Sequence, residues 1–581
     1  MVQSRRFRLM AFLFGKIGNL SPPAENPKPN GDIVLNFHLC PPAVGYAQLI
    51  PGNDDSTVLP GKALILGTAL LPSGLIDHPD RPEQPAAADG SDDPEALPAD
   101  LLRLAGAEGG FAFVFWEQAK AVLWLGTDRY GFKPFYYYYR DGELAFSTDL
   151  DRLVRNTSRK FEVNYSVFSQ YLCLRHPFGD ETLFREINRL PQGAFLRYSV
   201  PEDRLERVPY FDYRSFQPEL SITSQQVLAE GPARFTAALE RHVGRAQKVV
   251  LPLSGGYDSR MIACGLHRLG IELLTYTTHK DYRYTTDTIA AAEVGKLLGA
   301  THHDKALPTN YFALFHQQKC GMVHFETSYH PWIVNLLSIL PKEPFPCFDG
   351  LGGDACLGGS EITPEFWNLW RCEKYEQFAK EYFRWYKTIF GLLVTTAYLR
   401  EIEALAQQRI NAEIRRIKGN PNGLIYLGLR NFTRRAIALS TFGILGHERP
   451  IRTPFFDHQF FEWSLAIPVH LKVKTKIYRQ LFTDYSGKTA VVPNTHQRPK
   501  DSRYFQKTSA LWSKQVNRSY LGHIINQLTP FLPGFVNPSL KEKLSKKDPS
   551  VMHRDVLFAL ADLAYWFVTY QNNLTIRGWM K

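Results

Sequence analysis

The pattern of apolar and polar positions changes partway along the chain. Between residues 110 and 150, short apolar runs alternate with turn residues at 116–118, 128–131 and 141–142. Closely spaced apolar runs separated by turns predict a series of antiparallel strands. From about residue 215, strand-like runs are instead followed by stretches with helical spacing, which is typical of a parallel sheet. We therefore expect one domain at residues 1–210 and a second, α/β domain at residues 215–581.

The clearest boundary between two elements lies at residues 249–266. Residues 249–253 form a β-branched and leucine run that predicts a buried strand, and helical spacing resumes at about Asp258. Gly255 and Gly256 lie between them, where a helix N-terminus offers unpaired N–H groups that suit a phosphate. Asp258 would then hold Mg²⁺ against the phosphate. An ordinary glycine turn capped by Ser or Asp gives the same pattern, and no Walker motif is present.

Composition indicates an ordinary globular protein of two or more domains. The chain has 581 residues, of which 44% are hydrophobic and 22% are charged. The net charge of +11 is small for this length, so the basic run at 541–547 indicates a solvated face rather than a nucleic-acid site. The seven cysteines show no metal-ligand spacing, which favours reduced thiols and a cytoplasmic protein. No apolar stretch reaches transmembrane length, and we expect no membrane partner.

The first residues have features of a short signal peptide. Arg5, Arg6 and Arg8 precede the apolar run at 9–14. The run is at the lower length limit, Lys16 closes it and no small-residue cleavage site follows, so a first β-strand is the better interpretation. Residues 79–100 are rich in Pro, Ala and Asp and predict a surface loop.

Five ordered motifs between about residues 10 and 485 resemble the asparagine synthetase family. The stretch Ser254-Gly255-Gly256-x-Asp258-Ser259 is similar to the pyrophosphate loop of ATP pyrophosphatases. Residues 347–359 resemble the second glycine-rich loop of the family. The glutaminase half of the family is matched at 110–113, 128–136, 145–147 and 182–193. The family signatures that follow the second glycine-rich loop are matched at 452–457 and 467–482. Beyond about residue 490 we find no motif.

The resemblance implies a fold, two cofactors and a set of site residues. The N-terminal domain would be a glutaminase-like antiparallel sandwich of the Ntn type, and the C-terminal domain a doubly wound ATP pyrophosphatase domain that uses ATP and Mg²⁺. The metal would be held by Asp258 and Asp354. Asp287 matches the acidic residue that opens the helix at 287–304. The family's catalytic lysine falls at Thr475, so Lys474 and Lys476 are both candidates. The expected nucleotide-binding residues are Leu253, Ser254, Gly255, Gly256, Asp258, Ser259, Thr277, Gly352 and Gly353. A homodimer is possible.

Two departures from the family pattern concern function. Glutamine-hydrolysing members begin with a cysteine, whereas the first cysteine here is Cys40 and Phe14 falls near the nucleophile position. The stretches that would hold glutamine are also missing, so we expect an inactive glutaminase-like domain. Leu351 falls where asparagine-forming enzymes have a glutamate and β-lactam synthetases a tyrosine, and Ala355 replaces a glutamate. Unless His447 or Glu448 faces the same pocket, the general base is missing.

The favoured function is an amide-forming ligase. It would activate a small-molecule or peptide carboxylate as acyl-AMP, release pyrophosphate and transfer the acyl group to an amine, without its own glutaminase activity. The alternatives are an asparagine synthase that uses ammonia or glutamine, a lasso-peptide or β-lactam type of cyclase, and a non-catalytic ATP-binding relative. The sequence identifies neither substrate.

Overall fold

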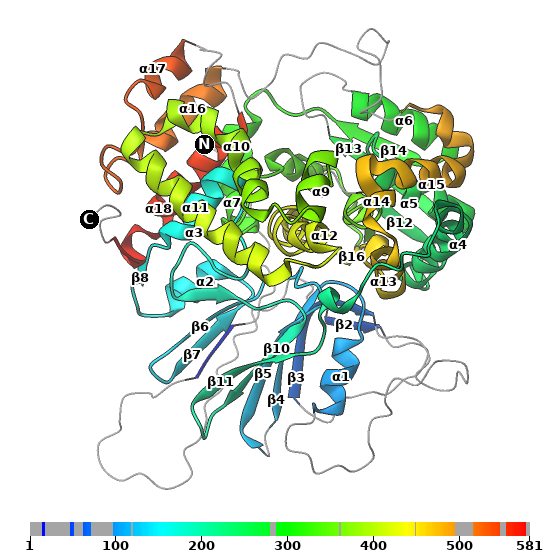
Figure 1. Cartoon of the computed structure of the whole chain (residues 1–581), viewed down its shortest axis with the longest axis horizontal. Coiled ribbons are helices and arrows are strands. Elements are labelled where there is room, and N and C mark those ends of the chain that lie inside the picture. The colour runs from blue at the N-terminus through cyan, green and yellow to red at the C-terminus, as the bar shows by residue number, and fades with distance from the viewer. Residues whose placement is uncertain are drawn as a thin grey trace. The chain divides into compact units, whose positions relative to one another are not determined.

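The computed structural model describes ten stretches of the chain: residues 14–17, 47–50, 62–70, 97–117, 120–278, 286–358, 362–447, 449–493, 515–546 and 554–576 (Figure 1). The chain forms two compact units. The first comprises Met1–Thr157 and Ile187–Asp212, and the second comprises Ser158–Glu186 and Tyr213–Lys581.

The first unit contains two sheets. The smaller has the strand order β1-β7-β6-β9, and its neighbouring strands are all antiparallel. Its strands are β1 (Phe14–Ile17), β6 (Tyr136–Arg140), β7 (Glu143–Ser147) and β9 (Ile187–Arg189). The larger sheet has the order β11-β10-β5-β4-β3-β2 and is antiparallel except for the β2–β3 pair. Its strands are β2 (Ala47–Ile50), β3 (Lys62–Leu70), β4 (Phe111–Glu117), β5 (Val122–Thr127), β10 (Ala194–Ser199) and β11 (Arg204–Pro209).

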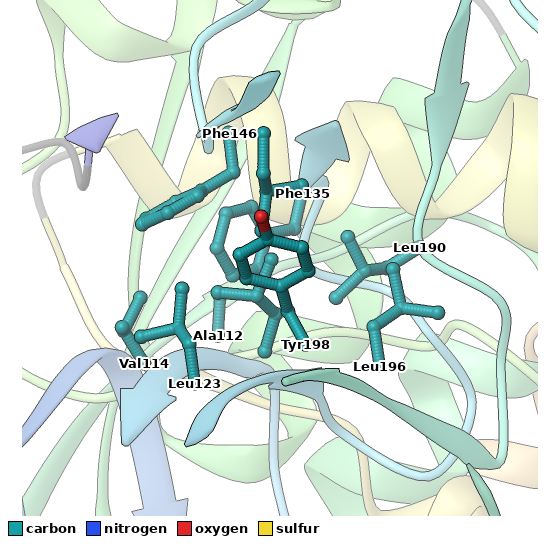
Figure 2. Packing of buried hydrophobic residues seen from close by; sticks show 10 residues of the cluster. Ala112, Val114, Leu123, Phe135, Phe146, Leu190, Leu196 and Tyr198 are labelled. Carbon is teal, nitrogen blue, oxygen red and sulfur yellow. The ribbon is translucent and has the colours of Figure 1, made fainter. Parts of the chain in front are cut away.

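The core of this unit lies where strands of the two sheets face each other. Side chains alternate along β4, so Ala112 and Val114 join one cluster while Phe111, Phe113 and Phe115 join another. Figure 2 shows the first cluster, in which Phe135 and Phe146 meet edge to face at 5.9 Å between ring centroids. The second cluster packs under helix α1 (Ala99–Ala105). The predicted antiparallel strands are confirmed.

The match to the family at Asp128 has a structural explanation. Its carboxylate accepts hydrogen bonds from the backbone N–H groups of Tyr130, Phe132 and Lys133 at 3.2, 3.0 and 3.0 Å. Arg189 donates to the carbonyls of Gly131 and Phe132 at 2.7 and 3.1 Å. Burial raises the pKa of Asp128 to about 6, although these N–H groups lower it. The motif therefore builds a buried turn.

Two predictions at the start of the chain fall mostly outside the described residues. The predicted first strand is described only from Phe14, where β1 begins. Of the predicted loop at 79–100, only the end is described, and there α1 starts at Ala99. Helix α2 (Leu150–Asn156) begins after Asp149, whose side chain accepts a hydrogen bond from Arg152 N.

A parallel sheet lies at the centre of the second unit. Its order is β14-β13-β12-β15-β16, and every pairing is parallel. The strands are β12 (Lys248–Pro252), β13 (Glu272–Thr278), β14 (Thr301–Lys305), β15 (Cys347–Phe348) and β16 (Ile451–Arg452). In chain order, β13 pairs with β12 and β14 pairs with β13, and β15 then pairs with the other side of β12. In open parallel sheets, ligands bind at the carboxyl ends of the strands where this order reverses.

Helices α5 and α6 pack against strands β12 to β14, and α4 and α15 pack on α5 (Figure 1). Their bounds are α4 (Ser224–Val243), α5 (Tyr257–Arg268), α6 (Thr286–Leu298) and α15 (Lys476–Ser486). The predicted strands at 249–253 and 273–277 correspond to β12 and β13. The predicted helix at 287–304 is too long, because it ends at Leu298 before Gly299, whose φ is +66°, and the chain continues as β14.

Apart from the short parallel pair β8 (Phe161–Glu162) and β17 (Leu574–Thr575), the remaining elements of this unit are mostly helices. Its helices include α3 (Tyr165–Leu174), α7 (Tyr311–Met322), η3 (Pro331–Ser338), α8 (Gly353–Leu357), α9 (Pro364–Arg371), α10 (Tyr375–Leu393), α11 (Thr396–Ile417), α12 (Gly423–Leu427), the π-helices η4 (Gly428–Ile437) and η5 (Leu439–Ile444), α13 (His458–Ala466), α14 (Val469–Lys472), α16 (Gln515–Asn526), α17 (Leu540–Ser545) and α18 (Arg554–Tyr570). None of the described helices combines the length and apolar character needed to cross a membrane.

The residues beyond 490, where the sequence has no motif, contribute to the core. Asp562 of α18 is buried and accepts hydrogen bonds from Tyr171 at 2.6 Å and from Lys319. His316 Nε2 lies 2.8 Å from its other oxygen. Burial acts to raise the pKa of Asp562, but Lys319 and His316 lower it to about 2. This network fixes α18 against α3 and α7.

Candidate active site

The predicted phosphate-binding loop joins β12 to α5. Helix α5 begins at Tyr257, one residue before the predicted start, and its N-cap residue Gly256 makes no side-chain cap. Ser259 Oγ accepts a hydrogen bond from Ser254 N and lies 3.0 Å from Ser254 Oγ, which in turn accepts one from Gly256 N. The loop is thus folded by its own hydroxyl groups, and the first N–H groups of a 12-residue helix face its open side.

Three neighbouring side chains hold this loop from outside. Arg260 donates to the carbonyls of Gly255 and Gly256 at 2.8 and 3.2 Å. Thr277 of β13 donates to Leu253 O at 2.6 Å. Asp287, which the resemblance singled out, accepts a hydrogen bond from Gly255 N at 3.2 Å. Thr277 and Asp287 therefore reach the loop through its backbone.

The second glycine-rich loop follows β15 and packs directly on the first. A Cβ added at Gly350 would lie 2.8 Å from Asp258 Cβ, and one added at Gly353 would lie 2.7 Å from Asp258 Cγ. Gly352 has a φ of +99°, which favours glycine. The glycines are needed because the two loops approach closely, and this approach brings Asp354 towards Asp258.

Acidic groups gather where the two loops meet. Burial raises the pKa of Asp258 well above its usual value, and the nearby Asp354 and Asp349 raise it further, although a hydrogen bond from Tyr478 opposes the shift. Ionised carboxylates this close together repel one another, so a bound cation would stabilise their charged forms. Because carboxylate oxygens are the ligands that Mg²⁺ prefers, Asp258 and Asp354 fit a divalent cation.

A cavity of about 270 Å³ opens beside the two loops. Of the predicted site residues, those that line it are Ser254, Gly256, Asp258, Ser259, Gly352 and Asp354. Leu253, Gly255, Thr277 and Gly353 do not line it and act through the loop backbone or through loop packing. The prediction that these residues bind the nucleotide stays a prediction.

The two candidate lysines lie in different surroundings. Lys476 is the first residue of α15 and lines a second hollow, of about 500 Å³, together with Tyr257 and Arg479. Both lysines are exposed, and Lys474 and Thr475 have left-handed backbone, with φ of +57° and +56°. Neither lysine lines the 270 Å³ cavity. Lys476 thus shares a hollow with Tyr257, which precedes Asp258 in sequence.

Several cavity residues were not predicted from the sequence. Asp349 precedes the second loop, and its Oδ1 accepts from Leu351 N at 2.9 Å and Thr441 Oγ1 at 3.1 Å. His330, with a φ of +57°, places Nδ1 2.9 Å from Ser440 Oγ. Asp349 could have been found from its place at the end of a strand, whereas His330 had no signal in the sequence.

The position predicted to lack a general base is filled by an apolar side chain. Leu351 is buried and lines the cavity. His447, considered as a replacement, is not a lining residue, and Glu448 lies outside the described residues. Cysteines offer no alternative, because the six described ones are all free and none lines the cavity.

Comparisons with known proteins agree with this geometry. Residues 232–568, more than half of the chain, match the asparagine synthase family, and residues 102–211 match a glutamine amidotransferase domain. A putative glutamine-hydrolysing asparagine synthetase of Mycobacterium tuberculosis is 27% identical over 213 residues, which cover 35% of this chain and 32% of that protein. Asparagine synthetase 1 of Bacillus subtilis is 22% identical over 205 residues, with the same coverage, and amidase chyE of Penicillium rubens is 28% identical over 171 residues, or 27% and 23% of the two chains.

The chain thus spans about a third or less of the length of these curated relatives. The match to the asparagine synthase family nevertheless extends from within α4 to within α18 and includes both glycine-rich loops. The chain belongs to the asparagine synthase family.

Proposed function

We propose that this protein is an ATP-dependent ligase that activates a carboxylate as acyl-AMP, releases pyrophosphate and transfers the acyl group to an amine. One observation carries the proposal. Asp258 and Asp354 lie on two loops that pack together at the carboxyl ends of β12 and β15, where the strand order reverses. In open parallel sheets ligands bind at this position, which supports a nucleotide site here.

The residues of the chain have separate roles in this proposal. The loop from Ser254 to Ser259 and the start of α5 bind the phosphates that leave as pyrophosphate. Asp258 and Asp354 hold Mg²⁺, which when bound neutralises phosphate charge and stabilises the leaving group. Lys476, which lines the 500 Å³ hollow, or its neighbour Lys474 supplies positive charge that offsets the negative charge developing on the phosphates.

We also propose that the first unit has no glutaminase activity. Phe14, at the start of β1, has no nucleophilic group, and its strand pairs with β7 through the Phe14–Ser147 register. Asp128, which matches the glutaminase half of the family, is used to build a turn. The domains predicted at residues 1–210 and 215–581 would then be a scaffold and a synthetase domain.

The test measures the products of ATP cleavage. With Mg²⁺, hydroxylamine and a panel of carboxylates, ATP should yield AMP and pyrophosphate together with a hydroxamate of the true substrate. Asp258→Asn, which keeps the shape of the side chain, should lower the rate by at least about 10²-fold. Release of ADP and phosphate would refute the proposal.

An ammonia-using asparagine synthase is the second candidate, supported by the names of the relatives. Leu351 argues against it, because a positioned base contributes about 10²–10⁴-fold to a rate and ammonia is largely protonated at neutral pH. Asparagine formed from aspartate, ATP and ammonium at about 1 s⁻¹ or faster would favour this candidate.

A further inference from the structure

One side of the 270 Å³ cavity is apolar. Helices α12, η4 and η5 and the neighbouring segments supply aliphatic and aromatic side chains that face the space beside the phosphate loop. These apolar lining residues include Ile333, Leu424, Ile425, Leu429, Phe432 and Ile437. η4 is a π-helix. This form is rare in proteins, and where it occurs it often lies at a functional site.

The same π-helix directs its positive charges away from the cavity. Arg430 binds Glu413 and Asp180, Arg434 binds Asp180 at 2.6 Å, and Arg435 binds Glu326 at 3.1 Å. Leu429, Phe432 and Thr433, which alternate with these arginines, line the cavity instead. Among the described residues that line the cavity, none is Lys or Arg.

The ionisable side chains among the described residues that line the cavity are three acids and His330. Apart from Asp258 and Asp354, the acid is Asp349, where both hydrogen bonds to described residues are accepted by Oδ1. Oδ2 accepts none from the described part of the chain. A substrate such as aspartate would bring two carboxylates into this cavity, where none of the described lining residues is a Lys or Arg that could bind the carboxylate that is not activated. An amine, which is protonated in solution, has the complementary charge.

We propose that this cavity binds the acceptor substrate as a primary amine with an apolar body, its ammonium group against Asp349 and its body against Leu429 and Phe432. This inference deepens the proposed function and rests on it, because it assigns the chemical class of the amine that receives the acyl group. The acyl donor and the nucleotide approach from the side of the two glycine-rich loops.

The test uses simple probes with the full chain. In the presence of Mg²⁺, n-propylamine, n-butylamine, n-pentylamine and n-hexylamine are titrated by calorimetry or ligand-observed NMR, with hexanoate and aspartate as comparisons. Affinity should rise about fourfold per methylene group, as expected for a buried CH₂. Hexanoate and aspartate should bind at least tenfold more weakly than hexylamine.

Three variants locate the binding. Asp349→Asn keeps an Oδ1 acceptor for Leu351 and Thr441 but removes the charge, and it should weaken hexylamine binding at least tenfold. Leu429→Ala should weaken hexylamine more than propylamine. Leu314→Ala is the matched control, because Leu314 is 54% exposed on α7 and does not line the cavity, and it should change nothing. If Leu429→Ala does not fold, Asp349→Asn and the chain-length series still test whether the cavity binds the amine.

The outcome separates this inference from the proposed function. The same titrations are repeated with the Mg²⁺ complex of α,β-methylene-ATP, whose own binding is followed by thermal shift. Nucleotide binding without preference for longer amines, equal affinity for hexanoate, or full affinity in Asp349→Asn overturns the inference alone. Amine binding with the expected pattern but no nucleotide binding supports the cavity assignment and refutes the ligase.

Discussion

Gly353→Ala tests whether the contact between the two glycine-rich loops positions a metal ligand. The added Cβ would lie 2.7 Å from Asp258 Cγ and 2.6 Å from the Tyr478 hydroxyl, whereas ordinary contacts lie at 3.4–4 Å. The Asp258 carboxylate must therefore move by roughly 1 Å, a displacement large enough to impair a positioned group. Gly353 begins the short helix α8 and has no left-handed φ, so alanine adds no backbone strain. The fold should be retained.

The expected loss can be worked out for nucleotide binding. Disturbing the groups around a metal ligand commonly costs 10–100-fold in metal affinity. At a Mg²⁺–ATP concentration about 100 times Kd, the nucleotide stabilises the wild-type protein by about 2.7 kcal/mol, and a 100-fold weaker Kd leaves only about 0.4 kcal/mol. Gly353→Ala should therefore lose most of the rise in Tm that Mg²⁺–ATP produces, while its Tm without nucleotide stays close to that of wild type.

Gly522→Ala is the matched control for this experiment. Gly522 lies within α16 and a Cβ there would meet nothing within 4 Å, so the variant should keep the full nucleotide-induced rise and be slightly more stable. If Gly353→Ala kept the full rise, the assignment of Asp258 as a positioned metal ligand would be wrong. If both variants lost the nucleotide-induced rise in Tm equally, the loss would reflect a general effect of replacing a glycine.

Three further predictions address other parts of the chain. Lys476→Ala should reduce the nucleotide-induced rise in Tm and Lys474→Ala should not, because only Lys476 lines the hollow with Tyr257; the reverse result would reassign the lysine. The purified protein should release no glutamate from glutamine beyond a heat-inactivated control, and sustained release would contradict the inactive first unit. Burial lowers the pKa of Lys472 to about 7, so the unfolded state binds more protons between pH 7 and 10 and stability should rise with pH across that range. Lys472→Met should reduce this rise in urea unfolding at pH 7 and 9, and an unchanged rise would show that the lysine is not its source.

The strand, glycine turn and helix at residues 248–268 could be predicted from the sequence because their determinants are local. The apolar run, the glycines and the resumption of helical spacing lie within 18 residues, and β12 and α5 follow them to within one residue. The helix predicted at 287–304 failed at its end for a local reason as well. Gly299 adopts a left-handed conformation there, and pairing with β13 makes the following residues a strand.

The rest of the site depends on contacts between distant segments. Tyr478 reaches Asp258 across 220 positions of sequence, and His330 meets Ser440 across 110. No spacing rule could anticipate these pairs. The backbone at Lys474 and Thr475 could not be anticipated either, because both residues before α15 are left-handed, a conformation that neither lysine nor threonine favours.

The matches to the family carry different information in the two units. In the first unit, Asp128 and Gly131 build a buried turn, so their retention requires only that the sheets fold. In the second unit, Asp354 lies beside a cavity and its like charge raises the pKa of Asp258, an arrangement that packing alone would not favour. Because like-charged acids so close together oppose each other's ionisation, this arrangement supports the proposed cation site. The sequence likeness therefore supports a function for the second unit and a fold for the first.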